Sequence, residues 1–318
     1  MDNIPTHTIN FSDKISCFEL SSYEFTKNLI CVALSDKIIL GLLQFPEDSA
    51  LECLEWKELK EIHSASRVES LAIAPNSTLV SVPKSVIFCT AGSDYNIRIY
   101  ATDLENANTV EVLSGHKSYI NSVAWDYSNE FLASGSDDHT LMIWNIQDNC
   151  KCAATFYFQS SVVTCKWHPD ESEKLMVAEK NGTIHLYNIT AGEVLLSVET
   201  ILNPLMCADW SLSNSAFICA IAAGETFIWD LKTPSRPVDT KHIHEDVGLA
   251  IKFSPHNELL TASIGRPMTT LKVMNCKSQI PQVEAPLILY GGLCWHYKHA
   301  YVGAAQDRKL CFWKVISK

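Results

Sequence analysis

A large aromatic side chain recurs along this chain at nearly constant intervals, and this period limits the possible folds more than any other feature. One series has successive separations of 42, 43, 43 and 42 residues and consists of Trp125, Trp167, Trp210, Phe253 and Trp295. A second series has separations of 44, 43, 42 and 84 residues and consists of Tyr100, Trp144, Tyr187, Trp229 and Trp313. Since 84 is twice 42, both series have one period, which indicates a repeated structural unit.

The stretch from Gly115 to Asn145 shows what one unit contains. It reads GHKSYINSVAWDYSNEFLASGSDDHTLMIWN. Turn residues separate apolar alternating segments at Val123–Trp125, Phe131–Ser136 and Thr140–Asn145, and this pattern predicts three short antiparallel strands. A sheet of this size is not stable alone and requires neighbours. Repeats of this length with four strands each are typical of β-propeller blades.

The Gly-His pair at the start of this stretch, the aspartate in its turn and its final tryptophan resemble the WD-repeat family. The resemblance implies a linked set of hydrogen bonds among His116, Ser134, Asp138 and Trp144. Asp138 lies four residues after Ser134 and six before Trp144, so a tight turn would aim its carboxylate at both strands and at the imidazole. These four residues are the predicted structural set.

Strand counting in this register gives seven blades, which predicts that residues 1–318 form a single all-β, seven-bladed β-propeller of WD repeats. No segment requires a helix. Blade one is the least regular, with strands predicted at Ile15–Leu20, Leu29–Leu34 and Lys37–Gln44 and a charged outer strand within Glu52–Ile62. In blade two, the connection Ala74–Pro83 replaces a tight turn and is predicted to be a surface loop.

Closure of the ring is predicted from the strand count at the two ends of the sequence. The last predicted strand, Lys309–Trp313, is only the third strand of blade seven. The segment Thr6–Phe11 alternates in the manner of a strand and precedes blade one. We therefore expect the N-terminal strand to pair into the last blade, because this pairing would remove an exposed sheet edge.

Composition limits the class of protein and of partner. The chain has 318 residues, of which 47% are hydrophobic, and no apolar run approaches the length of a membrane span. Its first residues show no signal-peptide pattern, so the 12 cysteines are expected to be reduced and mostly buried. A formal net charge of −11 argues against direct nucleic-acid binding and against docking on anionic lipid.

Three segments carry a closer resemblance: Leu113–Asn145, Cys165–Asn188 and Leu293–Val315. They are similar to the small, thirty-seven-kilodalton type of WD-repeat nucleoporin in the Y-shaped outer-ring complex of the nuclear pore. The resemblance implies a non-enzymatic structural subunit that binds a large scaffold nucleoporin and other outer-ring nucleoporins. It also implies a role in pore assembly and in nucleocytoplasmic transport of protein and mRNA. The implied location is the nuclear envelope, and kinetochores in mitosis for animal members.

Residue patterns that would indicate catalysis or metal binding are weak. No phosphate-binding glycine pattern and no Gly-x-Ser-x-Gly elbow is present, so we predict no catalytic residues, no cofactor and no small-molecule substrate. Cys150-x-Cys152 and His242-x-His244 have no second ligand pair at zinc-site spacing, so no metal site is predicted. His244 precedes Phe253 by nine residues, as His116 precedes Trp125, and is interpreted as its blade-six counterpart.

Two other function classes remain open at the level of sequence. The first is an adaptor or peptide-binding propeller, such as a substrate receptor of a ubiquitin ligase. Many such receptors carry Trp-Asp-x-Arg after the third strand, whereas this chain has Trp144-Asn145-Ile146-Gln147 and Trp229-Asp230-Leu231-Lys232, without the arginine. The second is an enzyme built on a propeller. No sequence feature identifies the partner-binding residues, because bulk hydrophobicity does not distinguish interfaces.

Overall fold

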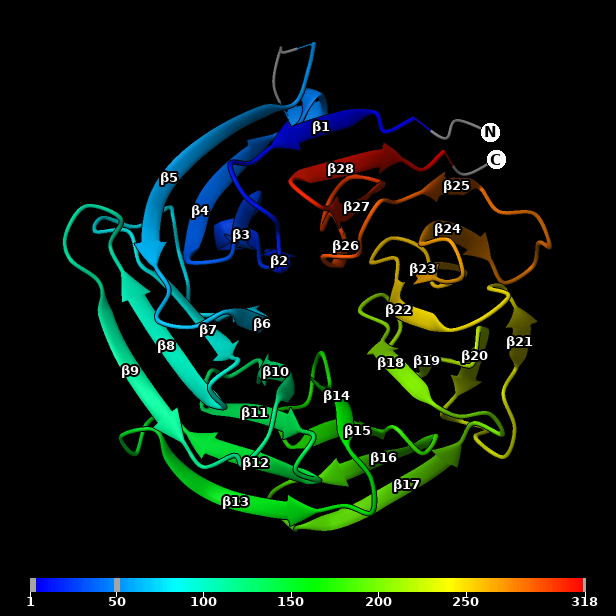
Figure 1. The fold of residues 1–318 in the computed structure, drawn as a ribbon. Coiled ribbons are helices and arrows are strands. Elements are labelled where there is room, and N and C mark those ends of the chain that lie inside the picture. The colour runs from blue at the N-terminus through cyan, green and yellow to red at the C-terminus, as the bar shows by residue number, and fades with distance from the viewer. Residues whose placement is uncertain (1–3, 49–51, 317–318) are drawn as a thin grey trace.

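The sequence folds into seven four-stranded antiparallel sheets arranged around a central axis (Figure 1). The computed structural model describes residues 4–48 and 52–316. Within these ranges the helical elements are two short 3-10 turns, η1 (Glu24–Thr26) and η2 (Pro46–Asp48). The predicted all-β, seven-bladed propeller is therefore confirmed. No helix in the described ranges has the length and apolar character that a membrane crossing would need.

The strands of each blade follow one another outward from the axis. Blade one contains β2 (Cys17–Leu20), β3 (Leu29–Ala33), β4 (Lys37–Gln44) and β5 (Glu55–His63). Blade two contains β6 (Val68–Ile73), β7 (Val86–Gly92), β8 (Asn96–Thr102) and β9 (Thr109–Ser114). Blade three contains β10 (Ile120–Trp125), β11 (Phe131–Ser136), β12 (Thr140–Asn145) and β13 (Lys151–Tyr157). Blade four contains β14 (Val162–Trp167), β15 (Lys174–Glu179), β16 (Thr183–Asn188) and β17 (Glu193–Glu199). Blade five contains β18 (Leu205–Trp210), β19 (Phe217–Ala222), β20 (Glu225–Asp230) and β21 (Asp239–His242).

Blade six contains β22 (Gly248–Phe253), β23 (Leu260–Gly265), β24 (Thr270–Asn275) and β25 (Val283–Pro286). Blade seven combines β26 (Leu293–Trp295), β27 (Tyr301–Gln306) and β28 (Lys309–Lys314) with β1 (His7–Asn10). β1 is antiparallel to β28, with His7 opposite Phe312 and Asn10 opposite Lys309. The predicted closure by the N-terminal strand is confirmed, and Figure 1 shows β1 as the outermost strand of the last blade.

The hydrophobic core lies in the layers between adjacent blades. The second strand of a blade is buried on both faces, so its sequence is a continuous apolar run rather than an alternating one, as in Leu29–Ala33 of blade one. The fourth strand faces solvent, and β17 is largely exposed. One cluster joins Trp125 of blade three to Ala72 of blade two, and another joins Phe18 of blade one to Phe312 of blade seven. Each blade is therefore stabilised by its neighbours.

Two predictions for the irregular blades agree with the structure. The charged segment after residue 51 forms the outer strand β5, as expected, and continues to His63. The connection Ala74–Pro83 lies on the surface, where Thr78 forms an isolated bridge with Ser85 and the Leu79 amide donates to the Phe25 carbonyl at 3.1 Å. This last bond attaches the blade-two connection to turn η1 of blade one.

Candidate functional site

Blade three brings the four predicted side chains together in one chain of hydrogen bonds. Trp144 Nε1 on β12 donates to Ser134 Oγ on β11 at 2.9 Å, and Ser134 Oγ lies 2.8 Å from His116 Nε2. His116 precedes β10, and its Nδ1 lies 2.9 Å from Asp138 Oδ2 in the turn between β11 and β12. The tautomer with its proton on Nδ1 gives every member of the chain a partner, because each group then donates to the next.

Asp138 accepts more hydrogen bonds than the spacing indicated, and from different residues. Its carboxylate also accepts from the Lys117 amide at 2.8 Å and from the Thr140 amide and hydroxyl at 3.0 and 2.6 Å. It does not bond Trp144, because Ser134 lies between them. Burial would raise the pKa of Asp138, but the bonds from Thr140, Lys117 and His116 outweigh it and lower that pKa. Burial lowers the pKa of His116 despite the carboxylate, so the imidazole stays neutral near pH 7.

Other blades keep only parts of this set. In blade six, His244 Nε2 lies 3.0 Å from Ser263 Oγ, which is the contact expected of a counterpart of His116. In blade two, Asp94 has the spacing of Asp138 but binds Arg98, with Nη2–Oδ2 and Nη1–Oδ1 distances of 2.6 and 3.0 Å. The spacing alone therefore fixes the turn position of the carboxylate and not its partner.

Blade seven lacks the serine that the tryptophan uses in blade three. Val302 pairs with Trp313 as Leu132 pairs with Trp144, which places Ala304 at the position of Ser134. Alanine has no acceptor, and the buried Nε1 of Trp313 has no hydrogen-bond partner among the described residues. This orphaned donor is a local cost to stability.

The tryptophans of the inner strands join neighbouring blades and do not form a ligand cage. Trp125, Trp167 and Trp295 donate through Nε1 to the backbone carbonyls of Ala72, Ala124 and Lys252 in the preceding blades, at 3.2, 2.9 and 3.2 Å. Trp210 instead donates to Ser215 of its own blade at 2.8 Å. All four rings are buried, as expected for repeated core packing.

Four charged residues hold equivalent positions at the inner ends of their blades, each directly before the last residue of an inner strand: Glu19, Lys166, Asp209 and Lys252. Asp209 Oδ2 accepts from the Phe253 amide at 2.9 Å, and its Oδ1 lies 3.6 Å from Lys252 Nζ. The nearby Lys252 ammonium lowers the pKa of Lys166, while burial raises the pKa of Glu19. The four residues carry two negative and two positive charges, and the contacts of Asp209 with Phe253 and Lys252 join blade five to blade six.

The two short cysteine and histidine pairs are not brought together. Cys150 Sγ lies 3.2 Å from Glu111 Oε2, whereas Cys152 is exposed. His242 lies beside Glu225, with a distance of 3.9 Å between Nδ1 and Oε1, while His244 contacts Ser263. In the part of the chain that the structure describes, no three His, Cys, Asp or Glu side chains are grouped to hold a metal ion.

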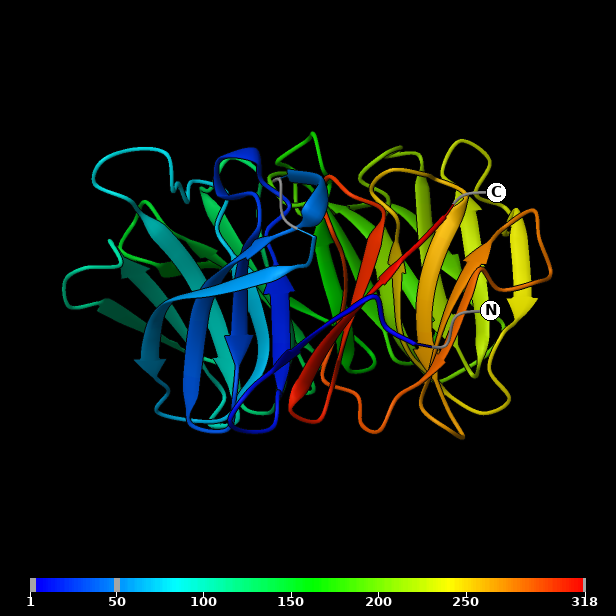
Figure 2. The ribbon, with the colours of Figure 1, turned by 90° about the horizontal axis from the view of Figure 1, so that it is seen from above.

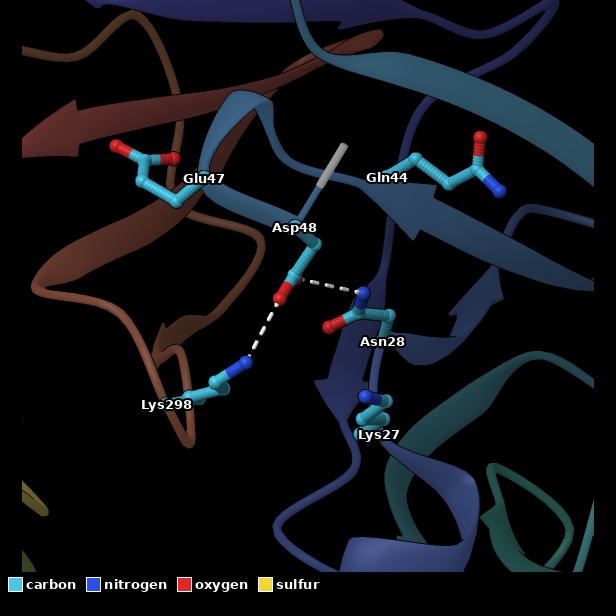
Figure 3. Close-up of a pocket in the computed structure, with 6 residues that line it drawn as sticks. All are labelled: Lys27, Asn28, Gln44, Glu47, Asp48 and Lys298. Carbon is cyan, nitrogen blue, oxygen red and sulfur yellow. Dashed lines mark hydrogen bonds and ion pairs between the residues drawn. The ribbon is translucent and has the colours of Figure 1, made fainter. Parts of the chain in front are cut away.

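A polar pocket of about 380 Å³ lies where blade one meets blade seven, and Figure 3 shows the six side chains that line it: Lys27, Asn28, Gln44, Glu47, Asp48 and Lys298. Asp48 of η2 binds Lys298 at 3.0 Å, Asn28 at 3.2 Å and His299 Nε2 at 2.9 Å. Burial would raise the pKa of Asp48, but these donors outweigh it and hold the pKa well below its usual range. The pocket was not predicted, because its residues are up to 271 positions apart (298 − 27).

His296 adjoins this pocket through Asn28 and has a fixed orientation. Its Nδ1 accepts from the backbone amides of Lys298 and His299 at 3.0 and 2.8 Å, and its Nε2 donates to Asn28 Oδ1 at 2.9 Å. Its ring also stacks on His299 at 4.9 Å. Burial, reinforced by His299, lowers the pKa of His296 to about 3. The arrangement holds the ring neutral and joins the two end blades.

Known proteins resemble the chain over nearly its whole length. It is 38% identical over 317 residues to Nucleoporin Nup37 of Drosophila melanogaster, covering 99% of this chain and 98% of the fly protein. It is 33% identical to Nucleoporin Nup37 of Homo sapiens, covering 96% of both chains. The chain belongs to the Nup37 nucleoporin family. The family resemblance predicted from the sequence is therefore confirmed.

Within this Nup37 family member, the family model for the WD domain, G-beta repeat matches residues 107–145. These residues include the complete hydrogen-bonded set of blade three. A chain of the Crystal Structure of Mitotic Checkpoint Complex superposes with a TM-score of 0.78, covering 100% of this chain and 93% of that one, at 15% identity. At that identity the likeness concerns the propeller fold alone.

Proposed function

We propose that this chain is a non-enzymatic structural subunit of the outer-ring scaffold of the nuclear pore complex, held there by a larger scaffold nucleoporin. The observation that carries the proposal is the full-length similarity to Nucleoporin Nup37 of fly and human. The propeller supports it, since the linked polar side chains of blade three bind one another within the blade. Through this scaffold the protein would contribute to pore assembly and to nucleocytoplasmic transport of protein and mRNA.

The proposal includes the partners and the place of the protein in the cell. Other outer-ring nucleoporins would be its neighbours at the nuclear envelope, and kinetochores would be a further location in mitosis. Residues 1–318 would act as one propeller domain with no small-molecule substrate, cofactor, nucleic acid or membrane insertion of its own. The net charge of −11 supports a protein partner over a polyanion.

A fluorescently tagged copy in interphase cells tests the proposal directly. We expect a punctate nuclear rim with slow exchange after photobleaching. Depletion of the large scaffold nucleoporin should release the tagged protein or lower its amount, because a bound partner stabilises the folded state by mass action. A diffuse signal that this depletion leaves unchanged would contradict the proposal.

Affinity purification separates this function from the alternative of a ubiquitin-ligase receptor. Co-recovery of outer-ring nucleoporins is the expected result. Recovery of ligase subunits without nucleoporins would favour the adaptor, although Gln147 and Lys232 stand where such receptors carry arginine after the third strand.

A further inference from the structure

One face of the ring gathers connections from three neighbouring blades. Figure 2 shows η1, η2 and the long connection from β6 to β7 projecting from the same side. The connection from β26 to β27 reaches the same place, because its Lys298 binds Asp48 of η2. Residues of blades one and seven line the pocket of Figure 3, and the connection of blade two lies beside turn η1.

The carboxylates of this pocket are already bound within the chain. Glu47 Oε1 accepts from Tyr301 at 3.0 Å and from Lys314 Nζ at 2.6 Å. Asp48 uses both oxygens for Lys298, Asn28 and His299. Neither carboxylate is thus free to attract a cation from a partner.

Hydrogen-bond donors remain free at the same pocket. The ammonium of Lys27 has no hydrogen bond or ion pair among the described residues, and Glu24 of the same turn does not pair with it there. The amide of Gln44 is also exposed and without a partner in the described ranges. The lining residues carry two positive charges, Lys27 and Lys298, and two negative charges, Glu47 and Asp48, and of these four only Lys27 has no side-chain partner in the described ranges.

Apolar side chains lie exposed beside the free lysine. Phe25, two residues before Lys27, is 63% exposed, and Val80 and Val82 are 75% and 95% exposed. The bond from the Leu79 amide to the Phe25 carbonyl places Leu79, and with it the adjacent Val80, beside turn η1, whereas Val82 lines a separate pocket with Asp103 and Glu105. An exposed aromatic anchor next to a charged rim is the composition of a binding hot spot.

We propose that the seam surface, defined by Phe25, Lys27, Val80 and Lys298, docks a segment of the partner protein that carries a carboxylate beside apolar side chains. The inference rests on the proposed function and specifies the contact with the larger scaffold nucleoporin. The partner must supply hydrogen-bond acceptors, because the two carboxylates of the pocket already have partners within the chain, whereas Lys27 and Gln44 are donors without a partner in the described ranges. Its apolar side chains would cover Phe25 and Val80, which the chain itself leaves in solvent.

The test is the affinity of the purified full-length protein for the purified large scaffold nucleoporin at two salt concentrations. Lys27→Glu should weaken binding about tenfold and flatten the salt dependence, since the charge acts at the rim. Phe25→Ala should weaken binding at least about fivefold and keep the salt dependence. Lys232→Glu on the far side of the ring, and Met268→Ala, which is 76% exposed in blade six, are matched controls that should bind normally.

The outcomes are distinguishable. Normal binding by both seam variants, with equal melting temperatures for all proteins, would overturn the inference and leave the proposed function standing. Absence of binding by the wild-type protein would overturn both. If Lys27→Glu instead abolished self-association in sedimentation, the occupant would be a second copy of this chain and the inference would be wrong.

Discussion

Asp138 is the residue on which the turn of blade three depends. Its carboxylate accepts from His116, Lys117 and Thr140, and its side chain is only 9% exposed. Asp138→Ala leaves the His116 and Thr140 donors without an acceptor, and each orphaned group costs about 1–3 kcal/mol. We expect the free energy of unfolding to fall by about 3 kcal/mol, measured by urea denaturation.

The adjacent aspartate is the matched control. Asp137 accepts from the Asn121 side chain at 2.8 Å, and this contact is exposed to solvent. Asp137→Ala should cost less than about 1 kcal/mol, because water replaces the lost partner. Equal losses for the two variants would contradict the assignment of Asp138 to the buried set.

Trp313 offers a test by gain of stability. Ala304 stands at the position of Ser134, and the Trp313 Nε1 has no partner among the described residues. Ala304→Ser should supply the acceptor and raise the free energy of unfolding by about 1 kcal/mol. Ala305→Ser places the same hydroxyl on the other face of the strand and should be destabilising. If both variants lowered the melting temperature alike, the missing serine would not explain the orphaned indole.

For individual residues, the sequence predicted only those side-chain contacts that a tight turn determines. The set of His116, Ser134, Asp138 and Trp144 is local enough for spacing to indicate which side chains could meet, and the structure brings them together. The pairing of Asp94 with Arg98 was not predicted, because two carboxylates at equal spacing bind different partners, Asp138 a neutral imidazole and Asp94 a guanidinium. Residues from opposite ends of the sequence, such as Asp48 and Lys298, meet only through ring closure.

Among the secondary-structure elements, β1 has the largest structural role for its length. Its four residues pair with β28, the Lys314 amide donates to Thr6 Oγ1, and Ile9 joins the core between blades one and seven. Deletion of residues 1–11 should leave β28 as an unpaired edge, so the protein should melt at lower temperature and aggregate.

Deletion of residues 1–5 is the control for that experiment, because it keeps the whole of β1. Calorimetry and light scattering on the two proteins measure the difference. If the protein that lacks residues 1–11 melted and remained soluble like the full-length chain, pairing with β28 would not be what stabilises the last blade.

Strand positions were predicted most accurately for buried strands, in which an apolar segment ends sharply at turn residues. Phe131–Ser136 and Thr140–Asn145 were predicted residue for residue, since buried strands have sharp apolar limits. A strand end that backbone hydrogen bonds define, without an apolar limit, was placed less well: β10 begins at Ile120, before the predicted segment Val123–Trp125. In β5, alternating charge hides the strand period, because this outer strand is mostly exposed.

The whole molecule should lose stability in mild acid because of its buried neutral histidines. Burial lowers the pKa of His296 to about 3, and that of His244 to about 4, from the usual 6.5. The stabilising effect is complete above pH 6.5 and is lost as the pH falls toward these values, because the unfolded chain then binds protons that the folded chain does not. Between pH 7.5 and 5.0, His296 alone should lower the free energy of unfolding by about 2 kcal/mol.

Denaturation in urea at the two pH values measures this effect. His296→Gln cannot titrate, so the variant should be less stable at pH 7.5 but lose less stability on going to pH 5.0. An unchanged pH dependence in His296→Gln would show that this ring does not remain neutral.

The pairing of β1 with β28 also has a consequence for synthesis on the ribosome. β1 is among the first strands to emerge, and it must wait for its partner until nearly three hundred further residues have been translated, since 309 − 10 is 299. Every product that stops before β28 therefore exposes the same unpaired segment and an unclosed ring, wherever translation failed. The quality-control machinery of the cell would need to recognise only one defect to remove them all.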